Sequence, residues 1–245
     1  MYHSVHKKFI ESSITHILEE VVHASAGIGN GIETFSLRDY LMPSVFLKMT
    51  GFQEQKLKCI VWEIATNDFD YRRTLLANEA KLGECSSYTD KNKVFLQLLK
   101  QVIEHNSTFD FKLEIDLTNM LENTIDFVKN NFAATNLSIW DQENFNTFIE
   151  MKITPSDIFV KGKHDSINLF GDNLQKKHKL LYNHRNRIAH NTLSYQQNLP
   201  TLNTLANPNY KYDNYFIYFS ILILIDKIFV ELYNKYLSAI DNNTN

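Results

Sequence analysis

The side chains of this chain that are best suited to chemistry on an anion lie in one hexapeptide, Arg185-Asn186-Arg187-Ile188-Ala189-His190. A guanidinium group can hold two phosphate oxygens through its planar fork, and an imidazole titrates near neutral pH, so that it can accept or donate a proton. From Asn173 to Tyr212 the chain contains neither Asp nor Glu. At the average acid content of the chain, about four or five carboxylates would be expected in a window of that length. The segment is therefore expected to attract anions, and phosphate is the first candidate.

The composition is that of an ordinary globular protein. Of 245 residues, 44% are apolar and 22% charged, which is enough to bury the core of one large domain or of a domain with an extension. A net charge of −3 excludes a general basic coat for nucleic acid, so any such affinity must come from a local patch. Cys59 and Cys85 match no metal or redox spacing, and without an N-terminal signal peptide they predict a cytoplasmic protein. The apolar run Tyr215–Ile225 is shorter than the roughly twenty residues that a bilayer requires, so no membrane span is predicted.

Helices dominate the expected secondary structure. Few glycines (7) and prolines (4) leave few turns, which favours long helices over a many-stranded sheet. Apolar spacing and capping signals predict helices over residues 2–23, 37–50, 53–82, 92–105, 116–132, 141–151, 172–190 and 213–240. Ser36 is the expected N-cap of the second helix, and Gly51 is its expected end. Alternating apolar residues from Phe109 to Ile115 predict a short strand, which could pair with residues 158–160 in a hairpin.

The hexapeptide is expected near the end of the helix over 172–190, for which Asp172 is the expected cap. A polar loop at 196–212 separates this helix from the strongly apolar helix over 213–240. That last helix is expected to pack against the helix that carries the hexapeptide and to line a dimer interface. The predicted fold class is therefore mainly all-α, with at most one short β-hairpin.

The pattern Arg185-Asn186-x-x-x-His190, near the end of one helix and ahead of a final long helix, resembles the signature of the HEPN superfamily. Members of that superfamily are all-α domains marked by an Arg, usually followed by a polar residue, and by a His a few positions later. The resemblance implies a HEPN-like helical bundle over residues 53–240. An N-terminal helical extension at 1–52 would precede the bundle, and a disordered tail at 241–245 would follow it.

What the HEPN resemblance implies is a metal-independent endoribonuclease, with neither cofactor nor metal. It would act as a homodimer in which two copies of the motif meet. Such domains commonly act in toxin–antitoxin systems or in antiviral (anti-phage) defence, so RNA and a regulatory partner protein or antitoxin are the implied partners. In some toxin members a Tyr two positions after the motif His is modified by a partner nucleotidyltransferase. This chain has Thr192 there and Tyr195 out of register, which puts that form of control in doubt.

Cleavage of RNA without a metal requires a base for the 2′-hydroxyl, donors for the crowded phosphorane and an acid for the leaving oxygen. His190 suits proton transfer, Arg185 can hold the phosphate, and Asn186 can orient the His or donate to phosphate. The products would be a 2′,3′-cyclic phosphate and a 5′-hydroxyl. Arg185 and His190 are five residues apart, which places them about 140° apart around a helix axis. The two side chains therefore cannot share one face of a straight helix. Either the helix unwinds before His190, or a second subunit completes the site.

Other polar side chains give weaker signals. Five cationic residues that flank the motif are candidates for RNA contact: Lys176, Lys177, Lys179, His184 and Arg187. A solvated helix face is the alternative for them. Asp68 and Asp70 have the wrong spacing to share a metal on a helix, and Arg72 and Arg73 are expected to form surface ion pairs with these acids.

A non-catalytic role for the same motif stays open. His190 could satisfy free carbonyls at a helix C-terminus, and Arg185 could be an ordinary ion-pair residue. The chain would then be a helical module that binds RNA or a protein through its basic surface. An open cleft in which Arg185 and His190 approach their two-fold mates would favour the ribonuclease. A motif that is buried and paired to acids would favour the binding module.

Overall fold

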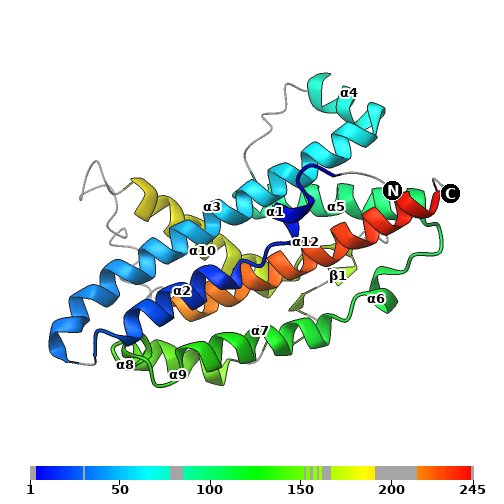
Figure 1. Cartoon of the computed structure of the whole chain (residues 1–245). Helices are drawn as coiled ribbons and strands as arrows, with labels where there is room; N and C mark the ends of the chain where they lie inside the picture. The colour runs from blue at the N-terminus through cyan, green and yellow to red at the C-terminus, as the bar shows by residue number, and fades with distance from the viewer. Residues whose placement is uncertain are drawn as a thin grey trace.

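The structure, a computed structural model, describes residues 4–29, 31–77, 85–151, 153–154, 157–158, 160–161, 167–190 and 214–243. Helices make up most of this part of the chain, which confirms the all-α prediction (Figure 1). The helices are α1 (Lys7–Glu11), α2 (Thr15–Ala26), the 3-10 turn η1 (Ile32–Thr34), α3 (Phe35–Asn67), α4 (Phe69–Ala77), α5 (Tyr88–His105), α6 (Phe111–Glu114), α7 (Leu117–Phe132), α8 (Asn136–Ile139), α9 (Gln142–Glu150), α10 (Asp172–His190) and α12 (Tyr215–Asn243). Two short strands, β1 (Val160–Lys161) and β2 (Ile167–Asn168), pair antiparallel.

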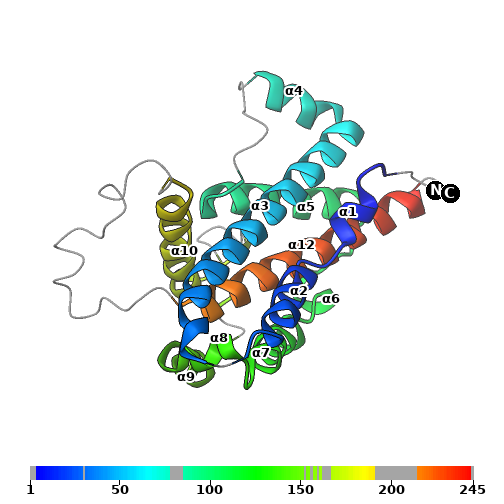
Figure 2. The ribbon, with the colours of Figure 1, turned by 60° about the vertical axis from the view of Figure 1, so that its left-hand side comes forward.

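The last helix, α12, forms the centre of the bundle. It contacts α3, α5, α7, α9 and α10, and its orange-to-red ribbon runs between α3 and α7 in Figures 1 and 2. The run Tyr215–Ile225 is almost continuously buried, so its apolar side chains form the core against these neighbours. In the described part of the chain, no helix has both the length and the apolar character needed to cross a bilayer.

A buried ion pair joins the two longest helices. Lys56 on α3 donates to both carboxylate oxygens of Asp226 on α12, at 2.8 and 3.0 Å, and both side chains are buried. Asp226 also accepts from the backbone N–H of Ile14 at 3.2 Å, just before α2. Since a buried carboxylate is costly unless its oxygens are paired, these three contacts fix the register of α2, α3 and α12 against one another.

α3 joins two predicted helices into one. It begins at Phe35, just before the helix predicted over 37–50, and it ends at Asn67, well before the predicted end of the helix over 53–82. Gly51 does not end a helix, because Thr50 just before it and Gln53 two residues after it are buried in the bundle. This packing outweighs the roughly 1 kcal/mol that a helical Gly costs. The boundary expected at residue 52 lies within α3, and residues on both sides of it share one hydrophobic core. The helix ends at Asn67, and Asp68 accepts from the N–H of Tyr71 at the start of α4.

The expected strand from Phe109 to Ile115 is wrong. Asp110 instead caps α6 by accepting from the N–H of Lys112 at 2.8 Å. Phe109, Phe111 and Ile115 are all buried around this turn, so their alternation reflects a compact capped helix rather than a pleat. The hairpin lies later in the chain, where Val160 pairs with Asn168 and Lys161 with Ile167. The expected single helix over 2–23 is likewise divided into α1 and α2.

The expected cap of α7 is confirmed, and its strength can be measured. Asp116→Ala is expected to lower the free energy of unfolding by about 1 kcal/mol. The side chain of Asp116 accepts from the N–H of Asn119 at 3.0 Å, and this donor has no partner within the helix. Urea unfolding would measure the loss, with Thr118→Ala, at an exposed position in the same turn, as the matched control. Equal losses in the two variants would contradict the assignment of the cap.

Candidate functional site

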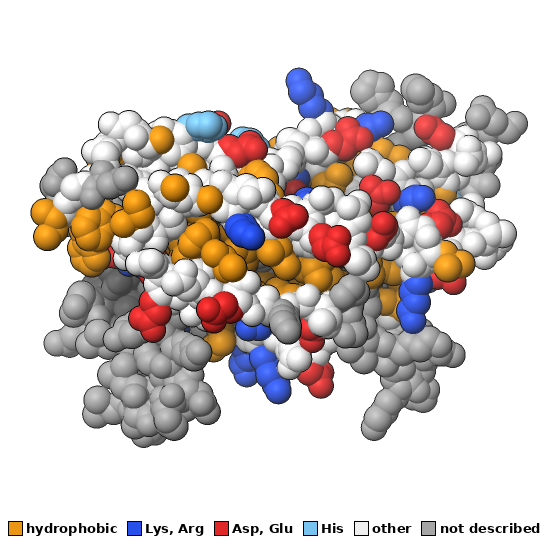
Figure 3. All heavy atoms as spheres, turned by 90° about the horizontal axis from the view of Figure 1, so that it is seen from below, with side chains coloured by type: hydrophobic (Ala, Val, Ile, Leu, Met, Phe, Trp, Pro, Cys, Tyr) orange, Lys and Arg blue, Asp and Glu red, His pale blue; other side chains and the backbone are white. Residues whose placement is uncertain are grey.

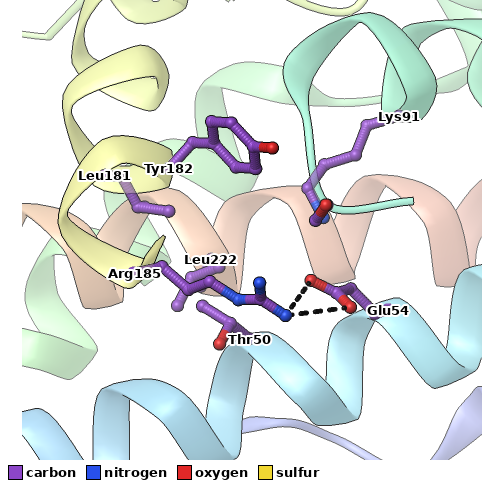
Figure 4. A pocket seen from close by; sticks show the side chains of 8 residues that line it. Thr50, Glu54, Lys91, Leu181, Tyr182, Arg185 and Leu222 are labelled. Carbon is purple, nitrogen blue, oxygen red and sulfur yellow. Dashed lines mark hydrogen bonds and ion pairs between the residues drawn. The ribbon is translucent and has the colours of Figure 1, made fainter. Parts of the chain in front are cut away.

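α10 positions the hexapeptide, and it spans Asp172–His190 as the sequence predicts. Leu174, His178 and Leu181 are buried, at the i, i+4, i+7 spacing of one helix face, which fixes the rotation of α10 against the bundle. This rotation turns Arg185 towards α3 and α5 (Figure 4).

Arg185 lies at the edge of the bundle, held between two residues. Its Nη2 is 3.3 Å from Oε1 and 3.5 Å from Oε2 of Glu54 on α3, and its Nη1 donates to Oδ1 of Asn186 at 3.2 Å (Figure 4). These distances exceed the 2.7–2.9 Å that is usual for a strong charge-assisted bond. The side chain is 28% exposed, and within the described part of the chain it makes no other hydrogen bond, so no described group accepts from its Nε–H.

His190 is the last residue of α10, and its side chain lies outside the described part of the structure. α10 does not unwind before His190, so the positions of Arg185 and His190 stay about 140° apart around the helix axis. Unwinding of the helix before His190, one of the two explanations left open by the sequence, is therefore wrong.

The basic residues of α10 divide between its two sides. Lys176 and Lys179 are exposed and Lys177 is half-buried, so the expected basic face is present over these residues. His184 does not belong to that face, because its ring is buried among aromatic residues and its Nε2 lies 2.8 Å from the hydroxyl of Tyr215. Arg187 contacts Nδ1 of the same ring at 3.1 Å, which draws its guanidinium towards the bundle.

A small cavity beside Arg185 contains a lysine that the sequence analysis missed. Thr50, Glu54, Lys91, Tyr182 and Arg185 contribute to the walls of this cavity, whose volume of about 10 Å³ is close to the least that a single water molecule needs (Figure 4). Lys91 is buried, and its ammonium donates to the backbone oxygen of Cys85 at 2.8 Å. Burial lowers the pKa of Lys91 to about 8; the nearby charge of Glu54 opposes this shift and that of Arg185 adds to it. The cavity therefore adds a second cation to the surroundings of Arg185.

One sequence signal could have revealed Lys91. It lies in phase with Val94, Phe95 and Leu98 on the apolar face of α5, where a lysine is unusual. No local signal identifies Glu54, because its contact with Arg185 joins helices far apart in the chain.

A larger hollow lies between the α1–α2 junction, α7 and α12. Its volume is about 260 Å³, and its polar lining includes Glu11, Asn123, Lys227 and Glu231. Burial lowers the pKa of Lys227. Figure 3 looks onto the underside of the bundle, where acidic, basic and apolar side chains are interspersed. With three carboxylates (Glu11, Asp226 and Glu231) and one ammonium in its lining, this hollow is less suited to a polyanion than the surroundings of Arg185.

No group of His, Cys, Asp and Glu side chains suited to a metal ion occurs among the described residues. The likeness to the HEPN superfamily depends on the motif alone. Comparison of the chain with protein families, with curated proteins and with solved structures finds no match.

Proposed function

We propose that this chain is a metal-independent endoribonuclease of the HEPN type. The observation that carries the proposal is the state of Arg185. Its guanidinium is oriented by Glu54 and Asn186, its side chain is partly exposed, and its Nε–H has no acceptor among the described residues. It lies on the helix that ends at His190, in a segment that contains no acid. An oriented and incompletely paired guanidinium is what the binding of a phosphodiester requires.

The proposed reaction begins with removal of the 2′-hydroxyl proton by His190 acting as the base. The 2′-oxygen then attacks the adjacent phosphorus, and Arg185 stabilises the negative charge that grows on the phosphoryl oxygens. As the P–O5′ bond breaks, a water molecule protonates the 5′-oxygen, and the hydroxide that forms takes back the proton held by His190. The products are a 2′,3′-cyclic phosphate and a 5′-hydroxyl. Asn186, which accepts from Arg185 in the free chain, is placed to hold the guanidinium in position.

The geometry of α10 supports the proposal of a homodimer. Because Arg185 and His190 occupy different sides of one straight helix, both groups reach one phosphate most readily when each chain contributes one of them. A toxin or antiviral defence effector, acting on RNA in the cytoplasm under the control of a regulatory partner or antitoxin, is the proposed biological role. It depends on the resemblance to the HEPN superfamily.

A second candidate is a non-catalytic helical module that binds RNA or a protein. The observation that favours it is the ion pair between Arg185 and Glu54, since a motif paired to an acid is what such a module would show. The two candidates differ in chemistry, because only the ribonuclease changes the covalent structure of RNA.

The test is incubation of the full chain with mixed-sequence RNA in EDTA, beside DNA of the same sequence. The RNA is expected to be cut to fragments that end in a 2′,3′-cyclic phosphate, and the DNA is expected to stay intact because it lacks the 2′-hydroxyl. Mass spectrometry of the fragments identifies the ends. Cleavage of both polymers, or ends with a 3′-hydroxyl, would contradict the mechanism. Binding of RNA without any cleavage would favour the module.

A further inference from the structure

The junction of α3 and α4 exposes aromatic side chains. Trp62, near the end of α3, is 59% exposed, and Phe69, the first residue of α4, is 65% exposed. α4 has no buried residue, and it stands away from the body of the bundle in both Figure 1 and Figure 2. Exposed large aromatic groups that gather in one segment, rather than singly, mark a surface that binds something.

Two guanidinium groups accompany these rings. Arg72 lies over the ring of Phe69, with its Cζ 5.3 Å from the ring centroid, and Arg73 is exposed beside it. The ion pairs expected for Arg72 and Arg73 are absent within the described part of the chain. Asp68 instead accepts from the N–H of Tyr71 at 2.9 Å and from Gln101 at 2.7 Å. Both arginines therefore keep their charge available to an anionic ligand.

We propose that Trp62, Phe69, Arg72 and Arg73, named here the α3–α4 aromatic surface, bind single-stranded RNA by stacking on its bases and pairing with its phosphates. Successive unpaired bases stack on aromatic side chains, and arginines track the backbone, in proteins that bind single strands without sequence preference. Bases within a duplex are already stacked on one another, so they cannot use these rings. The inference rests on the proposed function, and it assigns single-stranded RNA as the substrate class.

The position of this surface suits a strand that reaches Arg185. Glu54, which contacts Arg185, and Trp62 belong to the same helix, and the residues between them span about 12 Å along its axis. α3 is continuous between Glu54 and Trp62, so Trp62 keeps a fixed separation from the candidate site. A strand stacked on Trp62 would need to span little more than this separation to bring a phosphate to Arg185.

A second copy of the chain, or another protein, is the competing occupant. Exposed aromatic residues and arginines are also enriched in protein interfaces. The RNA assignment is favoured because neither guanidinium group has a carboxylate partner among the described residues, and Arg72 already lies over an aromatic ring. Arginine and aromatic side chains act together in the same way in grooves that bind single strands.

The test measures RNA binding by the full chain in a His190→Ala background, so that cleavage does not consume the ligand. The probe is a short mixed-sequence single-stranded RNA, and the comparison is the same RNA annealed to its complement. Trp62→Ala and Phe69→Ala are each expected to weaken binding of the single strand about ten-fold or more, and to leave binding of the duplex unchanged. Tyr40→Ala is the matched control, because Tyr40 is also an exposed aromatic residue of α3, 71% exposed, near its other end. It should change the affinity less than about two-fold.

Two further measurements assign the contacts. RNA binding is expected to quench the fluorescence of the chain, and Trp62→Leu should abolish that quenching although Trp140 remains. Changing Arg72 and Arg73 together to Gln should reduce the slope of log affinity against log salt by about 1.4, the value for two phosphate contacts on a single strand.

Single-strand affinity that is unchanged in Trp62→Ala and Phe69→Ala would overturn the proposal, as would a native chain that does not bind the single strand. If Trp62→Ala and Phe69→Ala gave a smaller particle than the native chain in light scattering, with no loss of RNA affinity per chain, the proposal would be overturned. The surface would then be a contact between two copies of the chain. Failure of the ribonuclease proposal gives a different result. If the native chain binds single-stranded RNA through Trp62 and Phe69 but does not cut it, the ribonuclease proposal is wrong and the α3–α4 aromatic surface still stands.

Discussion

His190→Ala is expected to lower the rate of RNA cleavage in EDTA about a thousand-fold, and Arg185→Lys about a hundred-fold. The first variant removes the group that takes the 2′-hydroxyl proton. The second keeps the positive charge but replaces a planar fork with a single ammonium, which cannot hold two phosphoryl oxygens at once. The ammonium would also remain near Glu54, whose carboxylate lies 14% exposed beside this position and would compete for it.

Single-turnover rates at saturating RNA measure these losses free of binding and product release. Arg38→Lys is the matched control, because it makes the same exchange at an arginine of α3 that is paired with Asp39 and Asp141, and it should change the rate only a few-fold. Each variant must keep the native melting temperature and oligomeric state. A native rate in Arg185→Lys would mean that Arg185 serves only to join α10 to α3 through Glu54. A mixture of His190→Ala with Arg185→Lys that regains part of the activity would show that two chains share one site.

Local signals account for the parts of the fold that the sequence predicts well. The bounds of α10, the cap of α7 at Asp116 and the apolar start of α12 all follow from periodicity and capping within a few residues. These signals depend only on neighbours in the chain. They are therefore visible in one sequence, and they place the hexapeptide at the end of a helix before any tertiary contact is known.

The surroundings of Arg185 depend on contacts that one sequence cannot show. Glu54 and Lys91 approach Arg185 from α3 and α5, and no spacing rule links residues so far apart in the chain. The acid-free segment correctly shows that the part of α10 around Arg185 supplies no carboxylate for it, but a carboxylate arrives from another helix. Arg72 shows the converse case, in which a local spacing suggests an ion pair that the fold replaces by stacking on Phe69.

A second large effect is expected from His178, whose ring is fully buried on α10 between Tyr88 and Phe170. Neither ring nitrogen has a hydrogen-bond partner in the described part of the chain. Burial, with a smaller contribution from the charge of Lys91, lowers the pKa of His178 to about 3. The unfolded chain binds a proton at this residue below pH 6.5, whereas the folded chain does so only below about pH 3. Unfolding is therefore favoured by acid within this window. The stability that depends on His178 is fully present above pH 6.5 and is lost as the pH falls towards 3.

The native chain is expected to lose about 5 kcal/mol of unfolding free energy through His178 between pH 6.5 and 3, and about 3 kcal/mol of this by pH 4. His178→Leu should remove that part of the acid sensitivity. It should also raise stability at pH 7 by about 1–3 kcal/mol, because it replaces two unsatisfied nitrogens with apolar surface of similar volume. Urea unfolding at several pH values measures both changes, with His23→Leu, at an exposed position of α2, as the control that keeps the native acid dependence. If His178→Leu kept the native slope between pH 6 and 4, the ring would have to be protonated or hydrogen-bonded in the folded chain. The packing of α10 on α5, and with it the placement of Arg185 beside Glu54, would then need revision.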